Sequence, residues 1–279
     1  GDGTTNTYSS PTVPVAIPSN RSVVTVGMGH HHTCAILDDG SLMCWGSDHD
    51  GRIGNGIEDT DAQYTPISIG IPDDRNAISV DAGHTNTCVL FDDGGIMCWG
   101  KDHVGQNGDA GSTSTAHSPG SNVALPEGRS AIDLSVGAYH SCAVLDNFSI
   151  TCWGWNEYGQ IGDNSTTHAH SPVFVQLPNG SKAIDVDAGE HHTCAVLENG
   201  SVNCWGWNKF KQVSGSDWKI LTPQHVDETN SFVHVIAAAR HTCALAGNGT
   251  ISCWGENGNG QLGIGSTWDK NQAHQLDWS

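Results

Sequence analysis

The sequence is poor in basic side chains. It has 11 Lys and Arg against 30 Asp and Glu, which gives a formal net charge of −19. A negative field of this size repels phosphate backbones and anionic lipid surfaces, so nucleic-acid binding and membrane insertion are not expected. Acidity keeps a repetitive β-protein soluble, and it also attracts basic partners or cations. The charge therefore excludes more functions than it identifies.

Long apolar runs and helix-favouring runs are missing as well. No stretch of about 18 apolar residues exists, so no membrane-spanning helix is predicted. No signal peptide is visible, and the sequence starts at Gly1, which we interpret as a processed mature chain or an excised piece. Glycine is abundant, at 35 residues. This balance predicts an all-β protein of short strands joined by tight turns.

Motifs that carry catalysis are absent from the sequence. There is no G-x-S-x-G, no phosphate-binding loop and no H-E-x-x-H. The segment Asp48-His-Asp50-Gly resembles part of a calcium loop but lacks the terminal glutamate, so turn chemistry explains it better. We predict no enzymatic activity, no catalytic residue, no metal site and no cofactor.

One pattern recurs five times, about every 50 residues, and such a period indicates structural repeats. The segments are GHHHTCAILDDGSLMCWG, GHTNTCVLFDDGGIMCWG, GAYHSCAVLDNFSITCWG, GEHHTCAVLENGSVNCWG and ARHTCALAGNGTISCWG. After CWG comes a Gly-rich turn, then a strand-like run beginning near a proline, as in Pro66-Ile-Ser-Ile-Gly-Ile, and an alternating strand such as Ala183-Ile-Asp-Val-Asp-Ala-Gly. About four short strands per repeat are typical of a β-propeller blade.

The repeats divide the chain into a single predicted β-propeller domain, 1–279. It contains a partial repeat, 1–22, followed by repeats 23–75, 76–129, 130–181, 182–230 and 231–279. The chain thus holds five complete repeats and a surplus half-repeat. The terminal segments could close a small ring or add a strand to a neighbouring molecule.

Each repeat carries two cysteines on facing strands of a hairpin. In the first repeat a turn of Asp38, Asp39 and Gly40 places Cys34 opposite Cys44, at the separation that a disulfide needs. The predicted bridges are Cys34–Cys44, Cys88–Cys98, Cys142–Cys152, Cys194–Cys204 and Cys243–Cys253. Disulfides predict an oxidising compartment: extracellular, cell surface or periplasmic. Phe148 occupies the turn position that glycine holds elsewhere, so that tip must shift or be strained.

These motifs resemble the regulator of chromosome condensation repeat family. Its pattern G-x-x-H-[ST]-x-A-L fits Gly189, His192, Thr193, Ala195 and Leu197, and its W-G-x-N-x-x-G-Q-L-G fits Trp254 to Gly263. The resemblance implies a β-propeller, commonly seven-bladed, whose members mostly bind proteins. It also implies a structural role for His32, His140, His192 and His241, which we expect to hydrogen-bond to backbone.

Other histidines and tryptophans fall outside the repeat. His30, His31, His84 and His191 could line one end of the central channel, where a transition metal is a minor alternative. Aromatic residues in variable loops suit interface anchors, although simple packing is an alternative. The binding candidates of this kind are Trp155, Trp207, Trp218, Trp268 and Trp278.

Six N-x-[ST] sequons are candidate glycosylation sites. Those in predicted exposed loops are Asn164 and Asn179, and the others are Asn20, Asn147, Asn199 and Asn248. Together these features predict an extracellular scaffold that binds a protein partner, or a glycan, through its loops. The alternative is a self-assembling structural subunit of a filament or surface layer, in which copies join through the terminal half-repeats.

Overall fold

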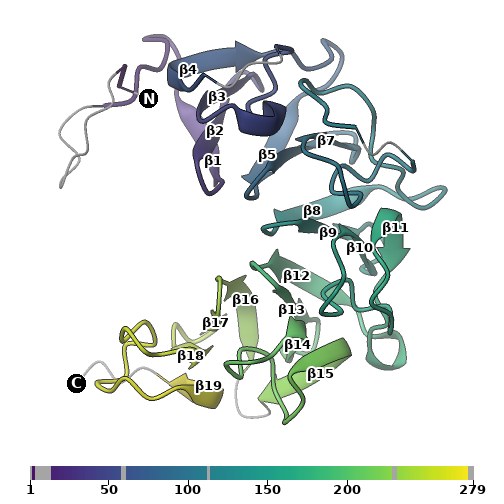
Figure 1. Cartoon of the computed structure of the whole chain (residues 1–279), viewed down its shortest axis with the longest axis vertical. Coiled ribbons are helices and arrows are strands. Elements are labelled where there is room, and N and C mark those ends of the chain that lie inside the picture. Colours follow the sequence, from purple (N-terminus) through teal and green to yellow (C-terminus); the bar gives the residue numbers. More distant parts are fainter. Residues whose placement is uncertain (1, 4–13, 58–60, 112–113, 228–230, 276–279) are drawn as a thin grey trace.

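The computed structural model describes residues 2–3, 14–57, 61–111, 114–227 and 231–275. Five antiparallel sheets follow one another along the chain and stand side by side around an open arc (Figure 1). The first and last sheets flank the opening, and the first strand of each sheet faces the centre of the arc. This arrangement confirms the predicted all-β propeller architecture.

Each sheet forms one blade, and we number the blades in chain order. Blade 1 contains β1 (Val23–Met28), β2 (His32–Leu37), β3 (Leu42–Gly46) and β4 (Gln63–Ile69). Blade 2 contains β5 (Ala77–Ala82), β6 (Asn86–Phe91) and β7 (Ile96–Gly100). Blade 3 contains β8 (Ala131–Val136), β9 (His140–Leu145), β10 (Ile150–Gly154) and β11 (Ala169–Phe174). Blade 4 contains β12 (Ala183–Ala188), β13 (His192–Leu197), β14 (Val202–Trp207) and β15 (Lys219–Asp227). Blade 5 contains β16 (Phe232–Ala237), β17 (His241–Ala246), β18 (Ile251–Gly255) and β19 (Lys270–Gln275). Two short 3₁₀ turns, η1 (His49–Gly51) and η2 (Pro178–Gly180), lie in connections.

Blade 2 differs from the expected four strands. Two isolated bridges, Met97 to Asn122 and Gly100 to Ala116, stand where a fourth strand would pair with β7. The corresponding sequence contains Pro119-Gly120-Ser121, whereas the fourth strands of blades 1, 3 and 4 continue through their proline. Since proline is accommodated in those strands, the difference is Gly120, and because glycine weakens a strand the segment stays a loop.

The hairpins have the predicted register. Cys34 pairs with Cys44, and Ile36 with Leu42, in the first blade. All five predicted disulfides are present, each with a Cα–Cα distance of 4.1 Å, which is typical of a non-hydrogen-bonded pair. Phe148 keeps the hairpin tip of its repeat at a φ of 66°, in the left-handed region that glycine favours.

The core lies between successive blades. Trp99, Trp153, Trp205 and Trp254 are fully buried at these junctions. The indole N–H of Trp153 donates to the carbonyl of Gln106 in the preceding blade at 2.9 Å. Aliphatic residues of the two facing sheets surround each indole. The repeated tryptophan therefore joins one blade to the next.

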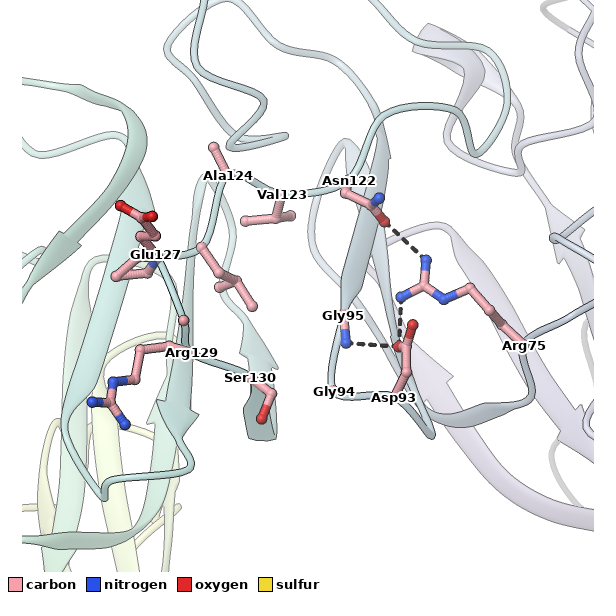
Figure 2. A pocket seen from close by; sticks show the side chains of 13 residues that line it. Arg75, Asp93, Gly94, Gly95, Asn122, Val123, Ala124, Glu127, Arg129 and Ser130 are labelled. Atoms are coloured by element: carbon pink, nitrogen blue, oxygen red, sulfur yellow. Dashed lines mark hydrogen bonds and ion pairs between the residues drawn. The ribbon is translucent and has the colours of Figure 1, made fainter.

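A pocket of about 470 Å³ lies at the hairpin-tip side of the junction between blades 2 and 3 (Figure 2). On one wall, the Arg75 guanidinium bonds to Asp93 at 2.7 Å and to Asn122 at 2.8 Å. The Arg75 guanidinium carbon also lies 4.0 Å from the centre of the Phe91 ring. Equivalent ion pairs join Arg129 to Asp146 and Arg21 to Asp39 in other blades. Because the repeat reproduces this pair, we assign Arg75 a structural role.

Candidate functional site

The turns that lead into β2, β6, β9 and β13 meet at the end of the arc opposite the hairpin tips. The amide of His30 donates to the carbonyl of Gly83, and the amide of His84 donates to that of Ala138. The contact is so close that a Cβ at Gly137 would overlap the carbonyl oxygen of Gly189. Side chains of residues next to these glycines are therefore gathered around one axis.

A continuous series of rings starts at this axis and extends over the loops of blades 3 and 4. We call it the aromatic band, and its members are His30, His31, His84, Tyr139, Trp155, Tyr158, His191, Trp207, Phe210 and Trp218. Every member is at least partly exposed, so the band forms a surface.

The first part of the band consists of imidazoles. The ring centres of His30 and His84 are 4.4 Å apart in a stacked arrangement, and His31 lies 4.1 Å from His30. Nδ1 of His84 is 3.3 Å from the Tyr139 hydroxyl. Burial lowers the pKa of His84, and the positive field of a protonated His30 would lower it further. Burial thus favours the neutral form of His84 within the band.

The second part is aromatic. Trp155 packs edge-on against Tyr139 at 5.7 Å, against Tyr158 at 5.3 Å and against His191 at 5.0 Å. Beyond them, Trp207 stacks on Tyr158 at 5.8 Å. Burial lowers the pKa of His191, although Glu190 beside it opposes the shift. These mutual contacts hold the rings in fixed positions before any ligand arrives.

A hollow of about 270 Å³ opens beside the band. Tyr139 and Trp155 form one wall, and Lys101, His103, Val104 and Gln106 form the other. Its lining is almost entirely apolar, which suits an inserted aliphatic or aromatic side chain.

The predicted binding tryptophans divide into three groups. Trp155, Trp207 and Trp218 are brought together in the band. Trp268 is 79% exposed in blade 5, and no ring contact is found for it within the described residues. Trp278 lies outside the described residues. Sequence reasoning missed Tyr139, Tyr158 and Phe210, although they too occupy positions that the repeat does not fix.

Two of the extra histidines, His30 and His84, line the hollow at the centre of the arc, as predicted for the end of the channel. His31 contacts His30, and Tyr139 and Trp155 link His84 to His191. Over the described ranges, no cluster of three or more His, Cys, Asp or Glu side chains is arranged to hold a metal ion.

The repeated histidines have a different partner from the one expected. Nε2 of His140 lies 2.8 Å from the Thr193 hydroxyl of the next blade, rather than bonding to backbone. The Thr193 hydroxyl donates to the carbonyl of Gln160, so it accepts the proton of His140 Nε2–H. His32 with Thr87, and His192 with Thr242, repeat this contact. Burial lowers the pKa of His32, His140 and His192 to about 3. They are therefore neutral structural groups, not acid–base catalysts.

The glycosylation candidates are distributed over the surface. Asn20 and Asn164 are exposed in loops, and the side chain of Asn179, in η2, lies outside the description. Those in hairpin tips accept hydrogen bonds from residues two positions later, namely Asn147, Asn199 and Asn248. The turn explains these three without a glycan.

The family model of the RCC1-like domain matches residues 1–278 of the chain. The chain belongs to the RCC1-like domain family. Among its relatives, the ultraviolet-B receptor UVR8 of Arabidopsis thaliana is 30% identical over 97% of the chain and 61% of the receptor. The human E3 ubiquitin-protein ligase HERC2 is 28% identical over 69% of the chain, but the match covers 4% of that protein. The chain thus spans less than two thirds of these relatives.

Solved structures support the fold assignment of the RCC1-like chain. Yeast RCC1 (Prp20) bound to Kap60 aligns with a TM-score of 0.82 at 20% identity, covering 92% of this chain and 62% of that one. Human WBSCR16 aligns with a TM-score of 0.84 at 20% identity, covering 95% and 70%. At this identity the likeness establishes the propeller fold only. Family membership indicates a protein-binding role in general terms, and the five disulfides indicate an oxidising environment.

Proposed function

We propose that this RCC1-like propeller is a non-enzymatic extracellular scaffold that binds a protein partner through the aromatic band. The observation that carries the proposal is the continuity of ten rings across four blades, at positions outside the repeat. Surface aromatic residues that are already held in place lose little side-chain entropy on binding, and Trp and Tyr are enriched among interface hot spots.

The cell surface, the extracellular space and the periplasm are the compartments that fit the disulfides. No helix within the described ranges has the length and apolar character needed to cross a membrane. The net charge of −19 opposes contact with nucleic acid. Asn164 is the sequon we assign to a glycan, because its side chain is exposed in the loop between β10 and β11, the loop that also carries Trp155 and Tyr158.

The test is affinity capture of secreted and cell-surface proteins from the source organism, followed by quantitative mass spectrometry. Trp155→Ala combined with Trp207→Ala should reduce capture of the specific partner at least tenfold. The control is Phe174→Ala, which removes a 49% exposed ring from β11 outside the band. Undiminished capture by the double variant would refute the proposal.

A second candidate is self-assembly, and the exposed faces of the two end blades favour it. On blade 1, Val26 and Met28 are 52% and 73% exposed, whereas their equivalents at inner junctions are buried. On blade 5, Ile236 and Leu245 border an apolar hollow of about 420 Å³. β19 pairs with β18 inside blade 5, so copies would join through these faces rather than through a free C-terminal strand.

Light scattering over a wide concentration range tests this candidate. A mass that grows with concentration, and returns to 29.4 kDa in Ile236→Ser, would support head-to-tail assembly. A constant mass would reject it. Ile236 is not part of the aromatic band, so capture by the band can be measured in the same variant.

A further inference from the structure

The loop between β14 and β15, residues 208–218, departs from the repeat at a conformational cost. Lys211 has a φ of 67°, at the position where Gly159 of blade 3 has a φ of 82°. A side chain in this left-handed region is strained, whereas glycine is not. Strain that a sequence retains in a surface loop motivates a search for function there.

The departures add positive charge next to the aromatic band. Lys209 lies 5.8 Å from the centre of the Phe210 ring, and Lys219 lies 5.0 Å from that of Trp218. The Lys211 ammonium donates to two loop carbonyls, those of Gly215 and Ser216, at 3.3 and 3.2 Å. None of these three lysines has a carboxylate within ion-pair distance among the described residues.

Basic residues on the hairpin-tip side behave differently. Arg75 is paired with Asp93 at 2.7 Å, and Arg129 with Asp146 at 3.3 Å. The blade 4 loop has two lysines and one acidic residue, Asp217, and the third lysine, Lys219, is the first residue of β15. At physiological ionic strength charges more than about 8 Å away are largely screened, so the local cations dominate over the net charge of the molecule.

The packing of the rings favours a polypeptide ligand over a sugar. Trp207 and Phe210 meet edge to face at 86°, and Tyr158 and Trp218 do so at 77°. Ring edges and lysine ammonium groups thus occupy faces that a sugar ring would need for stacking. The remaining surface, with Trp218 57% exposed, offers apolar contacts between cations.

We propose that the blade 4 loop binds an acidic segment of a partner protein, with carboxylates paired to Lys209, Lys211 and Lys219 and an apolar side chain against Trp218. The inference rests on the proposed protein-binding function and specifies the chemistry of the partner. A lysine–carboxylate pair that forms beside an aromatic surface is partly shielded from water, and this shielding strengthens the attraction between the two charges.

The first experiment uses a synthetic peptide of alternating Glu and Leu and its twin of alternating Gln and Leu, with binding followed by fluorescence anisotropy. The Glu peptide should bind at least tenfold more tightly than the Gln twin. The triple variant Lys209→Gln, Lys211→Gln, Lys219→Gln should remove this preference. A control variant, Arg129→Gln with Lys182→Gln, neutralises two cations away from the band and should retain it.

Lys211→Gly separates binding from folding. The substitution restores the glycine of the repeat, so the melting temperature should stay the same or rise while affinity for the Glu peptide falls. An equal affinity for both peptides, or unchanged binding in the triple variant, would overturn the inference. Preferential binding of polygalacturonate would overturn it in favour of an acidic glycan. If capture of the natural partner depends on Trp155 but not on the lysines, the band keeps its function and only this inference fails.

Discussion

The junction between blades 2 and 3 lacks a contact that the other three junctions share. At the junction of blades 3 and 4, His140, Thr193 and the carbonyl of Gln160 form a buried chain of hydrogen bonds. At the junction of blades 2 and 3, Asn86 and Ser141 occupy the corresponding places, and neither polar atom of the Asn86 amide finds a partner. The indole of Trp153 still bonds to Gln106 there. The blades thus pack here with the tryptophan contact and without the histidine contact, and we expect the histidine contact to add stability at the other three junctions.

Acid should weaken the three histidine junctions selectively. The pKa of His140 falls from 6.5 to about 3 on folding, so between these values the unfolded chain binds more protons and stability is lost as pH falls. His140→Gln retains a donor for Thr193 without titrating. Wild type should lose about 3 kcal/mol relative to this variant between pH 7 and pH 4. Urea unfolding at the two pH values measures the difference, and a constant gap would contradict the assignment.

Replacing His140 or Asn86 by alanine should lower the free energy of unfolding by unequal amounts at neutral pH. His140→Ala removes a buried ring and leaves the Thr193 hydroxyl with one partner fewer, at a cost of about 2–3 kcal/mol. Asn86→Ala removes an amide without partners and should cost less than about 1 kcal/mol. Matched urea titrations compare them. Equal losses would mean that the hydrogen bond contributes nothing beyond packing.

Asp81, a carboxyl at the junction of blades 2 and 3, should give the folding stability the opposite pH dependence. Burial is the main cause that raises the pKa of Asp81 to about 7, although Asp81 accepts a hydrogen bond from the Val136 amide. The folded chain therefore binds more protons between pH 4 and 7, and stability falls as pH rises through this range. Asp81→Asn should remove this decline and gain about 4 kcal/mol over wild type at pH 8 relative to pH 4, because one pKa unit corresponds to about 1.4 kcal/mol. A parallel pH dependence of the two proteins would refute the shift.

The smallest expected effect comes from introducing the histidine–threonine hydrogen bond at the junction of blades 2 and 3. Asn86→His with Ser141→Thr should stabilise the junction of blades 2 and 3 by about 1 kcal/mol, the usual net value of a buried hydrogen bond. The gain should exceed the sum of the single substitutions, because the two side chains contact each other. Strictly additive effects would show that the geometry of this junction differs from the others.

The hairpins could be predicted from sequence because every determinant is local. The turn Asp38-Asp39-Gly40 and the ten-residue spacing of cysteines fix the register within about a dozen residues. The bulge near the start of each innermost strand could not be predicted. Ile132 is skipped in the pairing of β8 with β9, and Ile184 in that of β12 with β13. Both fit the alternation of a regular strand, so the sequence pattern does not distinguish them.

The candidate site was only partly predictable for a different reason. Trp155 and Trp207 could be identified because they interrupt the repeat. Tyr139 occupies a position where the other repeats have His31, Thr85, His191 and Arg240, so it does not differ from an ordinary variable loop residue. The pairing of β9 with β10 sets Tyr139 beside Trp155, but only the angle between neighbouring blades brings Tyr139 against His84 and Trp155 against His191, and no single repeat encodes that angle.

Every disulfide closes a ten-residue hairpin, and none links two blades. If the chain is pulled from its two ends, no covalent bond therefore resists the separation of blades. Each blade can unravel as an independent step, while the hairpin inside its bridge stays short. At about 3.5 Å per residue, every intact bridge withholds roughly 30 Å of extension per blade. Reduction of the disulfides would lengthen each unfolding step without changing the number of steps, because the bridges limit how far each blade extends but do not hold the blades together.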